Sequence, residues 1–255
     1  MVSFDESYGE IMARYYDRAY AGLRDESDTN FYRALAREAA GPVLELGVGT
    51  GRVLLPIAAD GIPCTGLDLS QPMLNALRRK PHPPTLRLVH APMHAFELGS
   101  ERFALIYSAF RAFQHLCHVE DQLACLDCVR RHLAPGGTFA FDVFFPSLAR
   151  LAERDAPPAE DVRFLDGDDV IVRLTEAHPQ VERQILDVRM RYERWRGGMA
   201  VRTESVVFEL RYFFRYELEH LLARAGFGAV SIYGDFSRAP LGPASLHQVV
   251  VARVA

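Results

Sequence analysis

The 255-residue sequence has no excess of basic residues and no run rich in lysine or arginine. Lysine and arginine total 29 against 33 aspartate and glutamate residues, which gives a formal net charge of -4. Proteins that bind nucleic acids usually carry a basic surface, because contacts to phosphate supply much of their affinity. This balance argues against nucleic acid as a partner.

Long apolar runs are also missing. No stretch reaches the roughly 18 apolar residues that read as a membrane-spanning helix. The opening residues, MVSFDESYGE, lack the basic start and apolar centre of a signal peptide. We therefore expect a cytoplasmic protein without a membrane partner.

Cysteine is scarce, with four residues at positions 64, 117, 125 and 128. Cys125 and Cys128 form a C-x-x-C, which is found in redox pairs and in zinc sites. Here the pair lies in EDQLACLDCVRRHL, where apolar residues recur at helical spacing, and no second ligand pair accompanies it. We interpret the cysteines as reduced, and we expect no metal.

From Pro42 onward, short apolar runs alternate with helical patterns. Helical patterns in the first forty residues precede this region, and RYELEHLLARAGF followed by two further strands closes the chain. The runs predicted as buried strands are PVLEL, PCTGLD, LRLVH, FALIYS and TFAFDVF, and the helices between them are GRVLLPIAAD, QPMLNALRRK and DQLACLDCVRRHL. This alternation is typical of an α/β protein whose parallel sheet is covered by helices on both faces.

After Pro146 the pattern changes to alternating apolar and polar residues. Residues 160–214 contain several such stretches, and Arg196-Gly197-Gly198-Met199 has the composition of a hairpin turn. Alternation of this kind predicts antiparallel strands with one face in water. We expect an antiparallel β insertion.

The stretch VLELGVGTGR places Gly47, Gly49 and Gly51 directly after the first predicted strand. Glycine adopts backbone angles that other residues avoid, and it lets a ligand approach the chain closely. Ligands of open parallel sheets bind at the carboxyl ends of the strands, which predicts a nucleotide-like ligand beside this loop. The dinucleotide fingerprint G-x-G-x-x-G would need a glycine where Arg52 stands, so the pattern argues against a nicotinamide dinucleotide.

Asp68 ends the second predicted strand, 17 residues after Gly51. A carboxylate in this place can accept hydrogen bonds from both hydroxyl groups of a ribose. An aspartate at a strand end often caps the following helix instead, but Ser70 is better placed for that role.

These motifs together resemble the class I S-adenosylmethionine-dependent methyltransferases of the small-molecule type. The matching text is LELGVGTGR, GLDLSQPML and LAPGGTFAFDVF, and the resemblance covers roughly residues 40–145 and the closing strands. It implies a Rossmann-like seven-stranded sheet over 41–146 and 215–255, which would bind S-adenosylmethionine and release S-adenosylhomocysteine. Residues 1–40, which include the tyrosine-rich ARYYDRAY, would form a helical cap, and 147–214 a lid or homodimer surface.

The resemblance also implies roles for individual residues. The glycines would let the loop approach the methionine part of the cofactor, with Glu45 beneath the loop or facing the amino group through water. Asp68 would hold the ribose, and Arg52 would pair with the cofactor carboxylate or form a surface salt bridge. The residues expected to bind the cofactor are Tyr16, Tyr20, Glu45, Gly47, Gly49, Thr50, Gly51, Arg52, Asp68, Leu69, Met73, Pro92, Met93 and Ala109.

Two positions depart from the family pattern. Pro92 stands where an acid would bond the adenine amino group, and Ala104 stands where the fourth strand usually begins with an acid. Adenine would then be held by the backbone near Pro92 and Met93.

Catalytic residues are expected after the fourth strand, in SAFRAFQHL. Methyl transfer from a sulfonium needs mainly positioning and desolvation, and it needs a base only when the acceptor must lose a proton. The expected catalytic residues are His115, as a base or as a backbone partner, Arg111, as a substrate contact or in an ion pair, and Tyr20, over the sulfonium. Asp142 either contacts substrate or makes local hydrogen bonds.

The function predicted on this basis is methyl transfer to a small organic acceptor, at nitrogen or oxygen or at carbon. The alternatives are a non-catalytic protein that keeps the cofactor-binding fold, and an NAD(P)-dependent oxidoreductase.

Overall fold

The computed structural model describes residues 6–21, 25–153 and 156–254. Contacts between Cα atoms divide the described residues into two compact units. One comprises residues 26–146 and 212–254, and the other comprises helix α1 (Glu6–Ala21) and the segment Ser147–Arg211. Each unit is described below in its own right.

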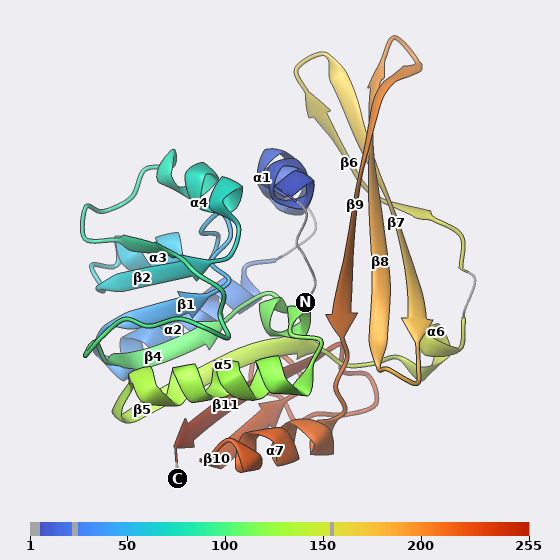
Figure 1. Ribbon diagram of the computed structural model, residues 1–255. Coiled ribbons are helices and arrows are strands. Elements are labelled where there is room, and N and C mark those ends of the chain that lie inside the picture. The colour runs from blue at the N-terminus through green and yellow to red at the C-terminus, as the bar shows by residue number, and fades with distance from the viewer. Residues whose placement is uncertain (1–5, 22–24, 154–155, 255) are drawn as a thin grey trace. The chain divides into compact units, whose positions relative to one another are not determined.

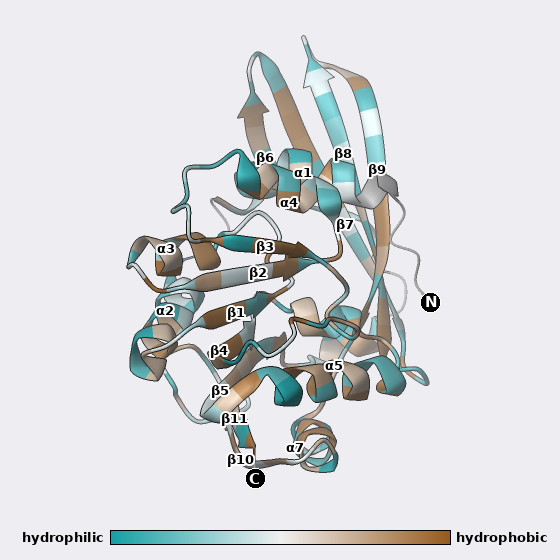
Figure 2. Cartoon of the chain, turned by 60° about the vertical axis from the view of Figure 1, so that its left-hand side comes forward, coloured by the Kyte–Doolittle hydropathy of each residue, from teal (hydrophilic) through white to brown (hydrophobic). Residues whose placement is uncertain are grey.

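The first unit is built on a seven-stranded sheet in the order β10-β11-β5-β4-β1-β2-β3. Strands β1 to β5 are parallel, while β11 is antiparallel to both β5 and β10. The strands are β1 (Val43–Leu46), β2 (Cys64–Asp68), β3 (Arg87–His90), β4 (Phe103–Ser108), β5 (Leu133–Phe144), β10 (Phe227–Tyr233) and β11 (His247–Val254). The predicted α/β sheet is confirmed, and its parallel strands β1 to β5 have their carboxyl ends at the same edge (Figure 2).

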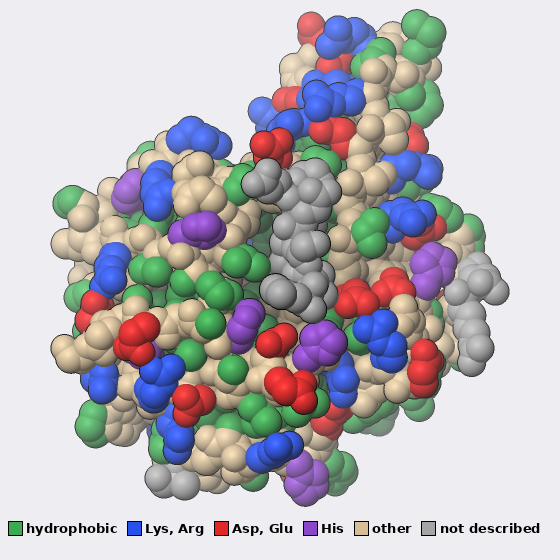
Figure 3. Space-filling view, viewed as in Figure 1, with side chains coloured by type: hydrophobic (Ala, Val, Ile, Leu, Met, Phe, Trp, Pro, Cys, Tyr) green, Lys and Arg blue, Asp and Glu red, His purple; other side chains and the backbone are tan. Residues whose placement is uncertain are grey.

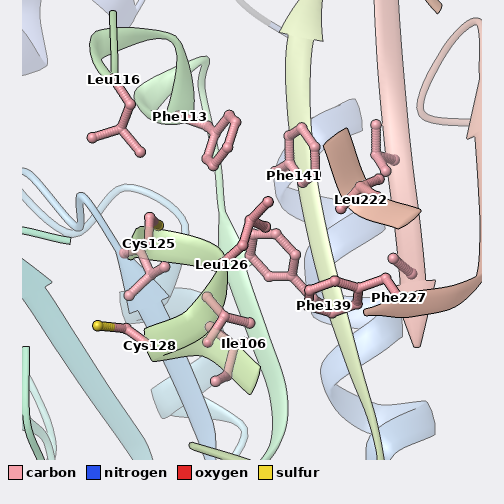
Figure 4. Close-up of a cluster of buried hydrophobic side chains, with 14 of the residues drawn as sticks. Ile106, Phe113, Leu116, Cys125, Leu126, Cys128, Phe139, Phe141, Leu222 and Phe227 are labelled. Carbon is pink, nitrogen blue, oxygen red and sulfur yellow. The ribbon is translucent and has the colours of Figure 1, made fainter. Parts of the chain in front are cut away.

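Two apolar layers cover this sheet. One packs α2 (Ser27–Ala39), α3 (Leu54–Ala59) and α4 (Gln71–Arg78) against it, and the other packs α5 (Val119–His132) and α7 (Arg215–Arg224). Figure 4 shows the second layer, in which Phe139, Phe141, Leu126 and Phe227 meet between α5, β5 and α7. All four described cysteines are free thiols in buried positions.

The second unit is built on a four-stranded antiparallel sheet in the order β6-β7-β8-β9. Its strands are β6 (Ala159–Asp166), β7 (Asp169–Gln180), β8 (Ile185–Arg196) and β9 (Met199–Arg211), and α6 (Leu148–Ala152) precedes them. The turn between β8 and β9 contains Gly197 and Gly198 with φ of 55° and 83°, as two-residue hairpins of the I′ type require. The predicted antiparallel insertion is therefore present.

Helix α1 packs on this antiparallel sheet. The ring of Tyr15 stacks on Tyr192 of β8 with centroids 4.9 Å apart, and Arg14 donates to Glu204 of β9 at 2.8 Å. Arg173 of β7 is fully buried, donates to both oxygens of Asp161 at 2.9 Å, and lies 4.9 Å from the centre of the Tyr20 ring. Basic and acidic side chains also lie next to one another over the sheet in Figure 3.

The described residues of the expected helical cap, 6–21 and 25–40, fall in both units. Helix α1 contacts the antiparallel sheet through Tyr15, whereas α2 belongs to the parallel sheet. The reason is the apolar face of α2, where Phe31, Tyr32 and Leu35 are buried against the apolar layer under β1 and β4.

We expect Phe139→Ala to lower the free energy of unfolding by about 3–5 kcal/mol, because a buried phenylalanine loses its contacts and leaves a cavity. Phe139 has no exposed surface and packs between Phe141 and Phe227. Urea unfolding measures this change. Tyr216→Ala is the control, because Tyr216 is 67% exposed, and a similar loss in both variants would contradict the assignment of this core.

Candidate functional site

A glycine loop connects β1 to α3 at the carboxyl edge of the parallel sheet. Gly47, Gly49 and Gly51 have φ values of 75°, 55° and 82°, in the left-handed region that disfavours other residues. The N–H groups of Gly47 and Val48 both donate to the carbonyl of Leu67 in β2, at 2.8 and 2.9 Å. The loop is therefore fixed to the neighbouring strand where it leaves β1.

The three glycines differ in the space around them. A Cβ atom on Gly47 would lie 2.7 Å from the Cβ of Ala112, and one on Gly51 would lie 2.9 Å from Leu77, so both positions are closed by packing. A Cβ on Gly49 would meet only Met73, at an ordinary 3.6 Å. The close approach of a ligand that the sequence predicts is therefore best supported at Gly49.

Asp68 ties the loop to the end of β2. Its Oδ2 accepts the N–H of Gly49 and its Oδ1 accepts the N–H of Ser70, both at 2.7 Å. Burial raises the pKa of Asp68, although the two N–H groups oppose this shift. Ser70 caps α4 as expected, by accepting the Met73 N–H at 3.4 Å. Both carboxylate oxygens of Asp68 therefore already accept a hydrogen bond from the backbone. Each oxygen can still accept one more, as ribose binding would require.

Other residues expected at the cofactor lie around the same loop. The carbonyl of the buried Thr50 accepts a hydrogen bond from Lys80 Nζ at 2.7 Å. Met93 reaches to 3.4 Å from the position of a Cβ on Gly47. Leu69 is 45% exposed, and Pro92 opens a turn in which its carbonyl accepts the Ala95 N–H at 3.1 Å.

Glu45 is buried within β1, where its Oε2 accepts the hydroxyl of Tyr107 at 2.9 Å. Burial raises the pKa of Glu45 to about 8, and this effect outweighs the opposing hydrogen bond from Tyr107. The carboxyl group is therefore held largely protonated at neutral pH.

Arg52, the residue after the last glycine, binds a carboxylate of the chain itself. Its Nη1 and Nη2 donate to the two oxygens of Asp28 in α2 at 2.8 and 2.5 Å, and only 2% of the Asp28 side chain is exposed. The guanidinium also lies 5.2 Å from the ring centre of Phe110. The structure shows a salt bridge, one of the two interpretations of Arg52, but this ion pair is largely buried and not at the surface. Pairing of Arg52 with the cofactor carboxylate stays a prediction.

The expected catalytic residues Arg111 and His115 lie beyond β4, around the short helix η1 (Ala112–His115). Arg111 has a φ of 65°, and its guanidinium lies 5.5 Å from the ring centre of Phe144. Burial lowers the pKa of His115 to about 4, so its imidazole is neutral at pH 7. Ala109, just before this segment, is buried and its carbonyl accepts the Ala112 N–H.

Asp142 of β5 makes local hydrogen bonds, which is one of the two roles that the sequence left open for it. Its Oδ1 accepts both the hydroxyl of Tyr32 and the N–H of Phe110, each at 2.8 Å. Tyr32 stacks on Tyr107 with centroids 4.7 Å apart. Sequence reasoning missed Tyr32, Tyr107 and Asp28, because each acts through a contact with a residue distant in the chain.

Tyr16 and Tyr20 lie on α1, within the unit of the antiparallel sheet. Their rings are 4.7 Å apart, and the ring of Tyr20 faces Arg173. The cationic partner that the structure shows for Tyr20 is thus an arginine, and its expected place over the sulfonium stays a prediction.

The residues at the carboxyl edge fit a nucleoside-type cofactor that carries a charged amino acid. Asp68 offers a carboxylate at the end of β2, and Gly49 leaves room for close contact at the loop. Among the residues that the structure describes, no group of three or more His, Cys, Asp or Glu side chains could hold a metal ion. Within that part of the chain, no helix is long and apolar enough to cross a membrane.

Comparison with known proteins decides between the remaining alternatives. The family described as "Methyltransferase domain" matches residues 43–137, the region of the glycine loop, Asp68 and β4. The structure of the CcbJ methyltransferase from Streptomyces caelestis superposes with a TM-score of 0.80 and 29% identity, covering 99% of this chain and 100% of that one. Residues 43–137 therefore form a methyltransferase domain, and the chain as a whole has the fold of the S-adenosylmethionine-dependent methyltransferases.

Two further relatives have names that indicate the position of methylation. The cypemycin N-terminal methyltransferase of a Streptomyces species is 28% identical over 146 residues, which span 57% of this chain and 58% of the relative. The glycopeptide N-methyltransferase MtfA, solved with sinefungin, is 25% identical with a TM-score of 0.57, covering 89% of this chain and 87% of that one.

We expect Glu45→Gln to remove one component of the pH dependence of stability. Because the folded pKa of Glu45, about 8, lies above its ordinary value of 4.5, this carboxyl group makes the protein less stable as pH rises from 4.5 to about 8. The loss is at most about 1.4 kcal/mol per pH unit. Glutamine keeps an acceptor for Tyr107, so urea unfolding of the variant should show a flatter pH profile. Exposed Glu120→Gln is the control, and identical profiles for wild type and Glu45→Gln would refute this assignment.

Proposed function

We propose that this methyltransferase transfers the methyl group to an amine nitrogen of a small organic acceptor. The proposal rests on His115, the polar side chain at the end of η1 beyond β4: burial lowers the pKa of its imidazole to about 4, which makes it a weak base at pH 7. A neutral amine attacks through its lone pair and loses its proton to water afterwards, whereas an alcohol needs a base during the transfer. The name of the glycopeptide relative states N-methylation, and the name of the cypemycin relative states an N-terminal methyltransferase; both support the same choice.

The cofactor supplies an electrophilic methyl group on a sulfonium and departs as a neutral thioether. In this proposal Asp68 binds the ribose hydroxyls, and the amide groups of the glycine loop face the methionine part. Asp68 already orders Gly49, so the loop is arranged before the cofactor binds, which lowers the cost of ordering it. In the transfer step the new nitrogen–carbon bond forms as the carbon–sulfur bond breaks.

Calorimetry of the full chain with S-adenosylmethionine, S-adenosylhomocysteine and NADH tests the cofactor assignment. We expect micromolar binding of the first two and none of NADH. Release of S-adenosylhomocysteine from a panel of primary and secondary amines, alcohols and phenols then tests the acceptor class. Turnover of alcohols or phenols alone would refute transfer to nitrogen.

We expect Asp68→Ala to weaken S-adenosylhomocysteine binding by at least about a hundredfold, because two hydrogen bonds to the ribose are lost. Hydrogen bonds to a charged group contribute about 1.5–3 kcal/mol each, and about 1.4 kcal/mol corresponds to tenfold in affinity. Calorimetry measures the change. The control is Cys125→Ser, a buried change in α5 away from the loop, which should lower stability but leave affinity unchanged. Equal, small effects on affinity would refute the placement of the ribose.

We expect the acidic limb of the kcat/KM profile to follow the pKa of the amine that is methylated. His115 titrates near pH 4, so it contributes no limb between pH 5 and 8. Profiles for a series of amines of different pKa, with wild type and His115→Asn, measure this. A limb that stays at one pH across the series and disappears in His115→Asn would instead identify the imidazole as the base.

A further inference from the structure

The segment that leaves β4 begins in a conformation that its residues disfavour. Phe110 and Arg111 are consecutive non-glycine residues with φ of 57° and 65°. Side chains with a Cβ atom rarely adopt this left-handed region, and such residues persist only where surrounding contacts hold them. The following residues 112–115 form η1, so the course of the whole segment depends on this pair.

Asp142 supplies the contact that holds the pair. Its Oδ1 accepts the N–H of Phe110 at 2.8 Å and, at the same distance, the hydroxyl of Tyr32 from α2. Neither Asp142 nor Tyr32 has exposed surface. Burial, and secondly the charge of Asp142, raise the pKa of Tyr32 well above its ordinary value, so its hydroxyl stays a donor. One buried oxygen therefore joins α2, β5 and the start of the segment.

Phe110 is fixed a second time through its ring, which lies 5.2 Å from the guanidinium carbon of Arg52. Arg52 is itself held by both oxygens of Asp28. The amide of Phe110 is thus bound to β5, and its ring packs against the residue that ends the glycine loop. The segment is placed relative to the cofactor loop at two points.

We propose that Asp142 is a positioning residue for methyl transfer, which acts through the Phe110 amide to direct the segment 110–115 toward the acceptor. This inference rests on the proposed function, because it takes the segment after β4 as the acceptor side of the site. Asp142 does not serve as the base, since its carboxylate has no exposed surface and its Oδ1 already accepts two hydrogen bonds.

The variants Asp142→Ala, Asp142→Asn and Tyr32→Phe distinguish the contributions of the two hydrogen bonds that Asp142 accepts. Alanine removes the acceptor of both donors. Asparagine keeps one oxygen that can receive both, and phenylalanine removes only the donor from α2. All three are made in the full chain.

With Asp142→Ala we expect kcat/KM for the best amine of the panel to fall by at least about tenfold, which corresponds to about 1.4 kcal/mol. S-adenosylhomocysteine affinity should stay within about twofold of wild type, and hydrogen exchange should accelerate at amides 110–116 but not at 43–51. Asp142→Asn should restore kcat/KM to within about threefold, and Tyr32→Phe should lie between wild type and Asp142→Ala.

Loss of S-adenosylhomocysteine binding in parallel with turnover would show a general structural role and overturn the proposal. So would an Asp142→Asn variant as defective as Asp142→Ala. If Asp142→Ala does not fold, Asp142→Asn and Tyr32→Phe still decide. Failure of wild type to bind the cofactor would count against the proposed function alone, because the exchange measurement needs neither cofactor nor acceptor.

Discussion

Burial of acidic side chains is the constraint on which the arrangement of the parallel-sheet unit depends. Glu45, Asp28 and Asp142 are each at most 3% exposed. A carboxyl group removed from water must receive hydrogen bonds or an opposite charge, because leaving it unpaired costs several kcal/mol. Each of the three is therefore matched with a donor from another element, and these pairings fix where the elements lie.

The donors explain why α2 belongs to the sheet. The hydroxyl of Tyr32 in α2 donates to Asp142 in β5, and Asp28 in α2 accepts a hydrogen bond from Arg52 at the end of the glycine loop. Tyr32 stacks on Tyr107, so the hydrogen bond between Tyr32 and Asp142 lies next to the one between Tyr107 and Glu45. Removing one partner of such a connected set leaves the other buried and unsatisfied, so the pairs depend on one another more than separate surface ion pairs do.

The sequence predicted those parts that are encoded by local patterns. Strand and helix alternation gave the sheet, the paired glycines 197 and 198 gave the hairpin, and Ser70 capped α4 as its place in the motif indicated. Pairings distant in the chain were not predictable in this way. Nothing near Arg52 indicates that Asp28, 24 residues earlier, is its partner, and no periodicity shows that α1 would pack with the antiparallel strands.

The buried carboxyl groups also bear on the form in which an acceptor is bound. A cationic amine brought out of water would need a carboxylate beside it, because desolvation of a lone charge is costly. Asp142 and Asp28 already hold donors of the chain, and burial keeps Glu45 largely protonated. With His115 also neutral, none of these four side chains is set to compensate the charge of a cationic acceptor. If nitrogen is the acceptor, the site selects the neutral amine, which is the form that carries the reactive lone pair.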